Sequence, residues 1–326
     1  MIKLFKKYFS KVPTPIAGLS LGVSSLGICL ENMYDFNNYA QLTFAIFSLL
    51  LLLILTLKFI CFPRYFFDDL SHPVTGSILP TISMTIMVIS TTINKYSFML
   101  GLTFWVLGII IHLCFLLTFL FFRIREFKLH HMIPSWFVPP VGIIVSAVTF
   151  PNLNSLLPLT YFLMLFGITT YLTILPLMLY RIIFETVIPK NTEPTLAIFA
   201  APPSISLAGY LTISSQPDIV VISILSSVSI FMTALVYLFF LKSLFRSFHP
   251  SYAAFTFPLV ISSVAMFKLS DWIHSMNFLT HYENKAHIVA EFEGIVALFA
   301  VFYVLINYIK LLINNFLSIE MSSKYL

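Results

Sequence analysis

Long uninterrupted apolar stretches cover most of this chain and limit it to folds that bury them in lipid. A helix needs roughly 20 mostly apolar residues to cross a bilayer, and stretches of that size, bounded by charged and turn residues, recur along the 326 residues. A soluble domain is about 25% charged, whereas 10% of this chain is charged and its mean hydropathy is +0.96. We therefore expect an all-α integral membrane protein with short loops and no separate soluble domain.

Ten membrane-spanning helices are predicted, in one transmembrane domain that covers residues 1–326. They are expected near residues 13–31, 41–62, 73–93, 98–122, 134–150, 159–181, 194–214, 219–241, 250–268 and 286–313.

The basic residues predict the orientation of these spans. All of the 18 Lys and Arg residues except Lys95, Lys268 and Lys285 lie at the two ends of the chain or near the loops that follow even-numbered spans. Cytoplasmic segments hold an excess of Lys and Arg. Both termini are therefore expected in the cytoplasm, with the chain in the inner cell membrane.

Proline marks alternate spans. The odd-numbered spans begin at Pro13, Pro73, Pro134, Pro194 and Pro250, roughly 60 residues apart, which indicates an internal repeat. Random enrichment of proline, which is common in membrane helices in general, is the alternative, but it would not select every second span.

In four of the five odd spans a second proline follows 5 to 9 residues after the first. These prolines are Pro80, Pro139 with Pro140, Pro202 with Pro203, and Pro258, and the same offset in the first span falls near Ser20. Interior prolines kink a helix, and a membrane tolerates them where neighbouring protein or water satisfies the freed carbonyl. The odd spans, rich in small and hydroxyl residues, are predicted to face one another away from lipid.

These patterns predict five helical hairpins around a pseudo-fivefold axis, with an inner ring of odd helices that lines a pore and an outer ring of even helices. No odd span carries a charged residue within its apolar stretch. Proton-coupled carriers usually place ionisable groups at membrane depth, so the pattern favours passive flow. Helix N-termini, nearby Lys and Arg residues and Ser and Thr hydroxyls would favour anions, and carbonyls freed at the kinks would oppose them.

Phe257 is the residue that the repeat singles out. It precedes the kink proline Pro258, where the corresponding positions hold the smaller side chains of Leu79, Val138 and Ala201. An aromatic ring at this position would plug a narrow apolar pore; ordinary packing between helices is the alternative. The predicted pore-lining and kink residues are Ser20, Leu79, Pro80, Val138, Pro139, Ala201, Pro202 and Pro258.

The chain also resembles a known family, that of the slow-type anion channels and the tellurite-resistance protein TehA of bacteria, grouped with dicarboxylate and sulfite exporters. The resemblance extends over nearly the whole chain and depends on the stretch from Pro13 to Gly22, on the stretch from Phe255 to Pro258, and on the order of the spans. It implies a homotrimer with one pore per protomer and a phenylalanine, here Phe257, that occludes each pore.

The expected function is that of an anion channel for chloride, nitrate or similar anions. A secondary transporter of C4-dicarboxylate, sulfite or tellurite-type oxyanions is the alternative, and a structural scaffold is a further one. Small inorganic or organic anions and membrane lipid are the expected partners, and nucleic acid is not. We find no catalytic constellation and no metal-ligand spacing, so no enzyme activity, cofactor or metal is expected.

Two acidic residues stand at the start of the last span. Glu291 and Glu293 are two positions apart, so they lie on different helix faces. The predicted topology places both near the outer headgroups. An interfacial position or a subunit contact is expected for them.

Overall fold

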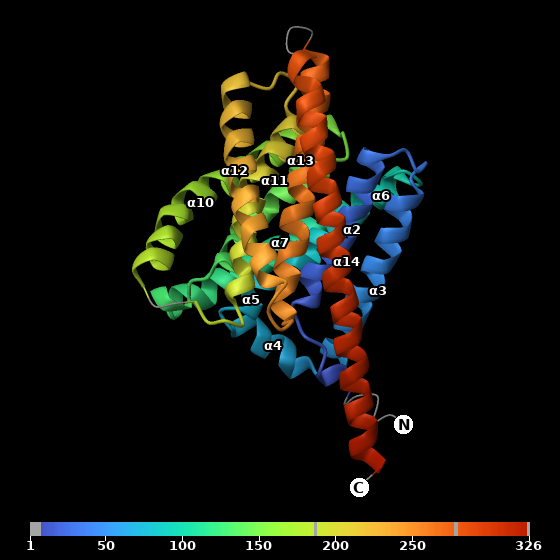
Figure 1. Cartoon of the computed structure of the whole chain (residues 1–326), viewed down its shortest axis with the longest axis vertical. Coiled ribbons are helices and arrows are strands. Elements are labelled where there is room, and N and C mark those ends of the chain that lie inside the picture. The colour runs from blue at the N-terminus through green and yellow to red at the C-terminus, as the bar shows by residue number, and fades with distance from the viewer. Residues whose placement is uncertain (1–7, 186–187, 277–279, 325–326) are drawn as a thin grey trace.

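The computed structural model describes residues 8–185, 188–276 and 280–324, and every regular element in this part of the chain is a helix (Figure 1). Six long helices run without a break: α2 (Ile16–Met33), α3 (Tyr39–Cys61), α7 (Phe98–Arg125), α10 (Leu157–Phe184), α12 (Ile219–Ser243) and α14 (Thr280–Lys324).

The other apolar segments are built from shorter pieces in series. Two of them pair a 3-10 helix with an α-helix: η5 (Glu193–Ala200) with α11 (Ala201–Ile213), and η6 (Pro250–Phe255) with α13 (Thr256–Ser275). A third consists of α5 (Thr75–Ile78) and α6 (Thr81–Asn94), and a fourth of η2 (Pro134–Phe137), α8 (Val138–Val141), η3 (Gly142–Ile144) and α9 (Val145–Val148). The connections contain α4 (Pro63–Ser71), η1 (Leu129–His131) and η4 (Asn154–Leu156).

Nine helical segments in the described part of the chain are long and apolar enough to cross a membrane. The fifth predicted span corresponds to the shorter apolar stretch Pro134–Val148. The count of ten crossings therefore stays a prediction.

Burial alternates along the chain. In the most apolar windows of α2, α5–α6, η5–α11 and η6–α13, 72% to 89% of the residues are buried, whereas the windows of α3, α7, α10, α12 and α14 are only 22% to 33% buried. Since apolar side chains that stay exposed in the folded chain need lipid or another subunit to cover them, the second group forms the outer surface. The stretch Pro134–Val148 is buried as well, except for the half-buried Val138 and Val148. These five buried segments are the ones that begin at or near the repeated prolines.

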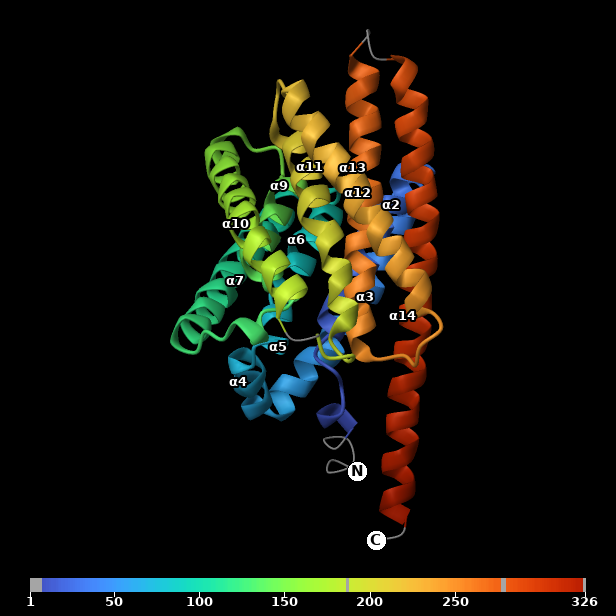
Figure 2. The same cartoon turned by 60° about the vertical axis from the view of Figure 1, so that its left-hand side comes forward.

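The buried segments contact one another in chain order and close into a ring. Helix α2 packs against α6, α6 against α9, α9 against α11, α11 against α13, and α13 against α2. Each of α3, α7, α12 and α14 packs on the buried segment next to it in sequence, as α14 does along α13 (Figure 2). Hairpins arranged around a fivefold axis stay a prediction.

The two ends of the described chain lie together. The Tyr8 ring packs edge-on against the ring of Phe316, with 5.4 Å between ring centroids. Lys11 Nζ donates a hydrogen bond of 3.4 Å to Ser318 Oγ. The segment before α2 therefore lies against the last part of α14.

Candidate functional site

The prolines determine where the buried segments are broken. Pro80 is the N-cap of α6, Pro139 and Pro202 occupy the first turns of α8 and α11, and Pro258 is the third residue of α13. Proline is tolerated in the first turn of a helix because the N–H that it lacks has no partner there. Each segment therefore restarts as an α-helix at its second proline.

Helix α2 differs from the other four buried segments. It begins after Pro15 and continues as an α-helix through Ser20 to Met33. The Ser20 hydroxyl donates to the carbonyl oxygen of Ala17 at 2.7 Å and lies 3.2 Å from Thr85 Oγ1 of α6. The helix is therefore not interrupted at the position where the repeat places Ser20.

All five buried segments line one small apolar cavity of about 70 Å³. We call it the apolar cavity; its walls are formed by Pro15, Gly18, Leu21, Ile78, Thr81, Met84, Phe137, Val138, Val141, Gly142, Thr195, Ile198, Ala201, Pro202, Ile205, Ser251, Ala253, Ala254, Phe257 and Pro258. No charged side chain of the described residues is among them.

The predicted pore residues divide into two groups. Val138, Ala201, Pro202, Phe257 and Pro258 line the apolar cavity. The remaining four, which are buried but not in its wall, are Ser20, Leu79, Pro80 and Pro139.

The hydroxyls of the apolar cavity already use their hydrogens. Thr81 Oγ1 donates to the carbonyl oxygen of Ile78 at 2.7 Å, and Thr195 Oγ1 donates to that of Thr192 at 2.6 Å. The Ser251 hydroxyl lies 3.0 Å from His249 Nδ1. A hydroxyl has one hydrogen to donate, so an ion in this cavity meets mainly C–H groups. The donation to anions that the sequence suggested for such hydroxyls is not available from Thr81 and Thr195 in this arrangement.

A second cavity of about 230 Å³ lies toward the C-terminal ends of α2, α6, α9 and α13. We call it the polar cavity, because its wall includes Glu31, Lys95 and Lys268 as well as Ser25, Asn32, Gln41, Thr91 and Thr149. Its apolar wall is formed by Ile28, Val88, Val145, Val148, Ile261 and Val264.

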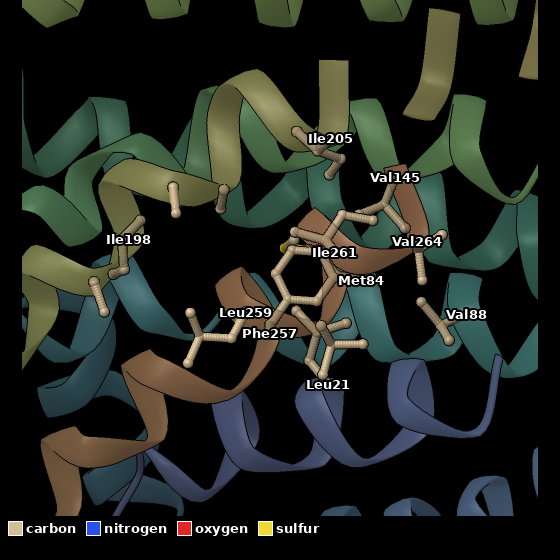
Figure 3. Close-up of a cluster of buried hydrophobic side chains, with 14 of the residues drawn as sticks. Leu21, Met84, Val88, Val145, Ile198, Ile205, Phe257, Leu259, Ile261 and Val264 are labelled. Carbon is tan, nitrogen blue, oxygen red and sulfur yellow. The ribbon is translucent and has the colours of Figure 1, made fainter. Parts of the chain in front are cut away.

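Phe257 is the one described residue that lines both cavities. Its side chain is 7% exposed. Figure 3 shows the ring at the centre of a group of aliphatic side chains, with Val145 and Val264 of the polar cavity on one side and Ile198 of the apolar cavity on the other. Phe257 therefore stands between the two cavities.

The helices run further than the apolar pattern indicates, and this changes the charge distribution. Helix α13 continues to Ser275 and α2 to Met33, so Lys268 and Glu31 lie inside helices and face the polar cavity. The expectation of a passage without charge therefore holds for the apolar cavity and fails for the polar one. The sequence contained the signal, since Phe257, Ile261, Val264 and Lys268 follow helical spacing.

The interfacial position expected for Glu293 is wrong. Its side chain is 3% exposed, and its Oε2 is buried without a hydrogen-bond partner among the described residues. The adjacent Gly294 lets α14 approach closely, because a Cβ there would lie 2.6 Å from Met33 Sδ and 3.1 Å from Ser263 Oγ. Glu291 is half-buried and pairs with His287 at 3.7 Å. The two acidic residues do lie on different faces, and the packing of α14 on α13 buries one of them.

Among the described residues, no group of three or more His, Cys, Asp or Glu side chains lies close enough together to hold a metal ion.

Comparison with known proteins identifies relatives. The family described as voltage-dependent anion channel matches residues 12–309. Two proteins of Methanocaldococcus jannaschii, both named uncharacterized transporter, are 27% identical to the chain. One aligns over 232 residues, 64% of this chain and 68% of the relative, and the other over 240 residues, 65% and 69%. The chain is a multi-pass membrane protein, as its family match and its long apolar helices both indicate.

Proposed function

Because the chain belongs to the voltage-dependent anion channel family, we propose that it conducts small anions passively through a pore that runs inside each protomer and is closed at Phe257. The observation that carries this proposal is the position of Phe257 between two cavities, one of which is lined by all five buried segments. We propose further that these segments belong to five hairpins around the pore axis.

The closed state follows from the chemistry of the barrier. A narrow apolar constriction excludes water and so blocks ions, which cannot leave their hydration shells without compensation. The side chains around Phe257 are apolar on both sides. Leu21 and Met84 lie on the side of the apolar cavity, and Ile261, one turn after Phe257 in α13, lies on the side of the polar cavity. Rotation or displacement of one ring would join the two cavities.

The direction of the buried helices favours anions, because several of their N-termini meet at the apolar cavity. Helices α2, α6, α11 and α13 all begin at the apolar cavity, whose wall includes Gly18, Thr81, Ala201 and Pro258 from their first turns. A helix N-terminus carries about half a positive charge, so four such ends give the cavity a positive potential. Since the apolar cavity has no charged side chain and few free donors, binding there is weak, as rapid passage requires.

The test compares two phenylalanines of the same segment. Phe257→Ala removes the ring between the cavities and is expected to raise anion current through the reconstituted protein in planar bilayers. Phe255→Ala is the matched control, because Phe255 is fully buried against Phe239 and Phe240 and lines neither cavity. This control loses the same ring volume and should not raise the current. An unchanged current in a correctly folded Phe257→Ala protein, or a current carried by cations, would overturn the proposal.

A second candidate is a secondary transporter or exporter of C4-dicarboxylate, sulfite or tellurite-type oxyanions. Two relatives bear the name transporter, and the polar cavity offers a place where a substrate could be held. A carrier saturates and shows exchange or proton coupling, whereas a channel gives currents that reverse at the equilibrium potential of the anion. Reversal potentials in chloride, nitrate, sulfite and malate separate the two.

Orientation and assembly complete the proposal. We propose that the protein lies in the inner cell membrane with both termini in the cytoplasm. Most Lys and Arg residues then lie on the cytoplasmic side, as they do in membrane proteins generally. The apolar cavity then faces the cytoplasm and the polar cavity the outside. The homotrimer implied by the family resemblance stays a prediction.

A further inference from the structure

We propose that the polar cavity is a binding site for one small monovalent anion, such as chloride or nitrate, and that Lys268 supplies its positive charge. This inference deepens the proposed function, because it places a selective site on the far side of Phe257 from the apolar cavity.

The cavity and its lysine belong to one helix face. Phe257, Ile261, Val264 and Lys268 follow one another at intervals of three and four residues along α13, and all four line the polar cavity. Lys268 stands three turns beyond Phe257, roughly 16 Å along the axis at 1.5 Å per residue. An anion that passes Phe257 therefore meets this lysine next on the same face.

Glu31 is the acidic residue of the cavity wall, and its charge is already engaged. Its Oε1 accepts hydrogen bonds from the backbone N–H groups of Ala40 at 3.0 Å and Gln41 at 3.4 Å, and its Oε2 accepts one from Phe36 at 3.2 Å. Three backbone donors thus hold the carboxylate, two of them in the first turn of α3, where the helix N-terminus also favours a negative charge. Glu31 is not available as the ion-pair partner of Lys268.

Lys95, the other cation of the wall, donates one hydrogen bond to Asn38 Oδ1, which tethers its ammonium group but leaves its charge in place. Lys268 has neither a hydrogen bond nor an ion pair within the described residues; the exposed Asp271, three residues on in α13, attracts it electrostatically from outside the cavity wall. A partly buried ammonium group with no anion in direct contact is costly. An anion in the cavity would offset that cost.

A second donor points to the same ligand. The Ser25 side chain is 4% exposed and lines the polar cavity, and its Oγ has no hydrogen-bond partner among the described residues. A hydroxyl without an acceptor is a ready donor, and an anion accepts from both an ammonium and a hydroxyl group. The cavity of about 230 Å³ holds one such anion with part of its hydration shell, at about 30 Å³ per water.

Equilibrium binding tests the site without requiring conduction. Radioactive chloride is titrated onto the purified full-length protein in detergent, with gluconate as the balancing anion. Lys268→Met should weaken binding about tenfold or more, because a hydrogen bond to a charged group is lost with the charge. Lys268→Arg keeps the charge and should stay within about threefold of the wild type. Lys285→Met is the control, since it removes an equal charge from an exposed position on α14.

Ser25→Ala provides an independent variant if Lys268→Met does not fold. It removes the free hydroxyl without changing charge and should weaken chloride binding a few-fold. Chloride binding that is absent in the wild type, or equal in the wild type and all of these variants, would overturn the site. Binding that depends on Lys268 in a protein with no anion current in the Phe257→Ala variant would support the site and overturn the channel. Anion current through Phe257→Ala together with chloride binding that does not depend on Lys268 would support the channel and overturn the site.

Discussion

The backbone nitrogen of Phe257 lies 3.1 Å from the position that a Cβ atom on Gly22 would occupy. The side chain of Thr256 lies closer still to that position. Helix α13 therefore passes over α2 at a point where only a glycine leaves room for it. We therefore expect this crossing to set how far Phe257 projects between the two cavities.

Gly22→Ala should push the start of α13 away from α2 and displace Phe257. Inserting a methyl group into a packed contact costs about 1–3 kcal/mol, so the melting temperature should fall. A displaced ring seals the passage less well, and the basal anion current should rise. Thermal unfolding in detergent and bilayer recordings of the same preparation measure both effects.

Gly18→Ala is the matched control on the same helix. A Cβ there would lie 3.7 Å from Ala253 Cβ and 3.9 Å from its carbonyl oxygen, which are ordinary contact distances. This variant should keep the melting temperature of the wild type. Equal behaviour of Gly18→Ala and Gly22→Ala would show that the α2–α13 crossing does not position Phe257.

Much of the fold could be predicted from proline spacing and hydropathy. The period set by Pro73, Pro134, Pro194 and Pro250 separates the buried segments from the exposed ones. Proline has this power because it removes a backbone donor, and such a defect is tolerated best where neighbouring protein satisfies the freed carbonyl. The exposed Pro176 within the outer helix α10 is an exception to this division. The first span carries no proline at the offset seen in the other four, and α2 runs unbroken through Ser20.

The positions of the charged side chains inside the protein could not be predicted in the same way. Hydropathy ends a span at the first charge, so the predicted ninth span stops at Lys268 although α13 continues for two more turns. Burial of Glu293 depends on how closely α14 approaches α2 and α13 at Gly294. These positions follow from contacts between distant segments, which a periodic pattern in one segment does not encode.

His72 gives the fold a dependence on pH. Burial lowers the pKa of His72 below its ordinary value of 6.5, with Asp69 acting in the opposite direction and Arg123 in the same one. Its Nδ1 accepts hydrogen bonds from the backbone N–H groups of Val74 at 3.2 Å and Thr75 at 3.4 Å. Both bonds require an unprotonated Nδ1.

Stability should therefore fall as the pH is lowered through 6.5. In that range the unfolded chain takes up a proton on this residue that the folded chain does not bind, because the folded pKa is the lower one. Thermal unfolding in detergent at a series of pH values between 5 and 8 measures the slope. His72→Asn keeps an acceptor for the two N–H groups and does not titrate, so its slope should be shallower. A slope identical to that of the wild type would contradict this role.

His112 connects two of the broken segments from an outer helix. Its Nε2 lies 2.8 Å from the carbonyl oxygen of Pro139, and its Nδ1 lies 3.0 Å from the Ser83 hydroxyl, one turn after Pro80. The side chain is fully buried in the described structure. One imidazole thus links the first turns of α6 and α8, where the prolines leave fewer backbone hydrogen bonds.

His112→Phe should lower the free energy of unfolding by about 2 kcal/mol, because it keeps the ring volume and leaves the Pro139 carbonyl and the Ser83 hydroxyl without this partner. Thr118→Val is the control on the same helix, since that hydroxyl bonds only to the carbonyl of Cys114 in its own helix. Ser83→Ala should cost less than His112→Phe, and the double variant should cost less than the sum, since both remove the same bond. Additive losses in thermal or denaturant unfolding would mean that His112 and Ser83 act separately, and the link between α6 and α8 would then depend on packing alone.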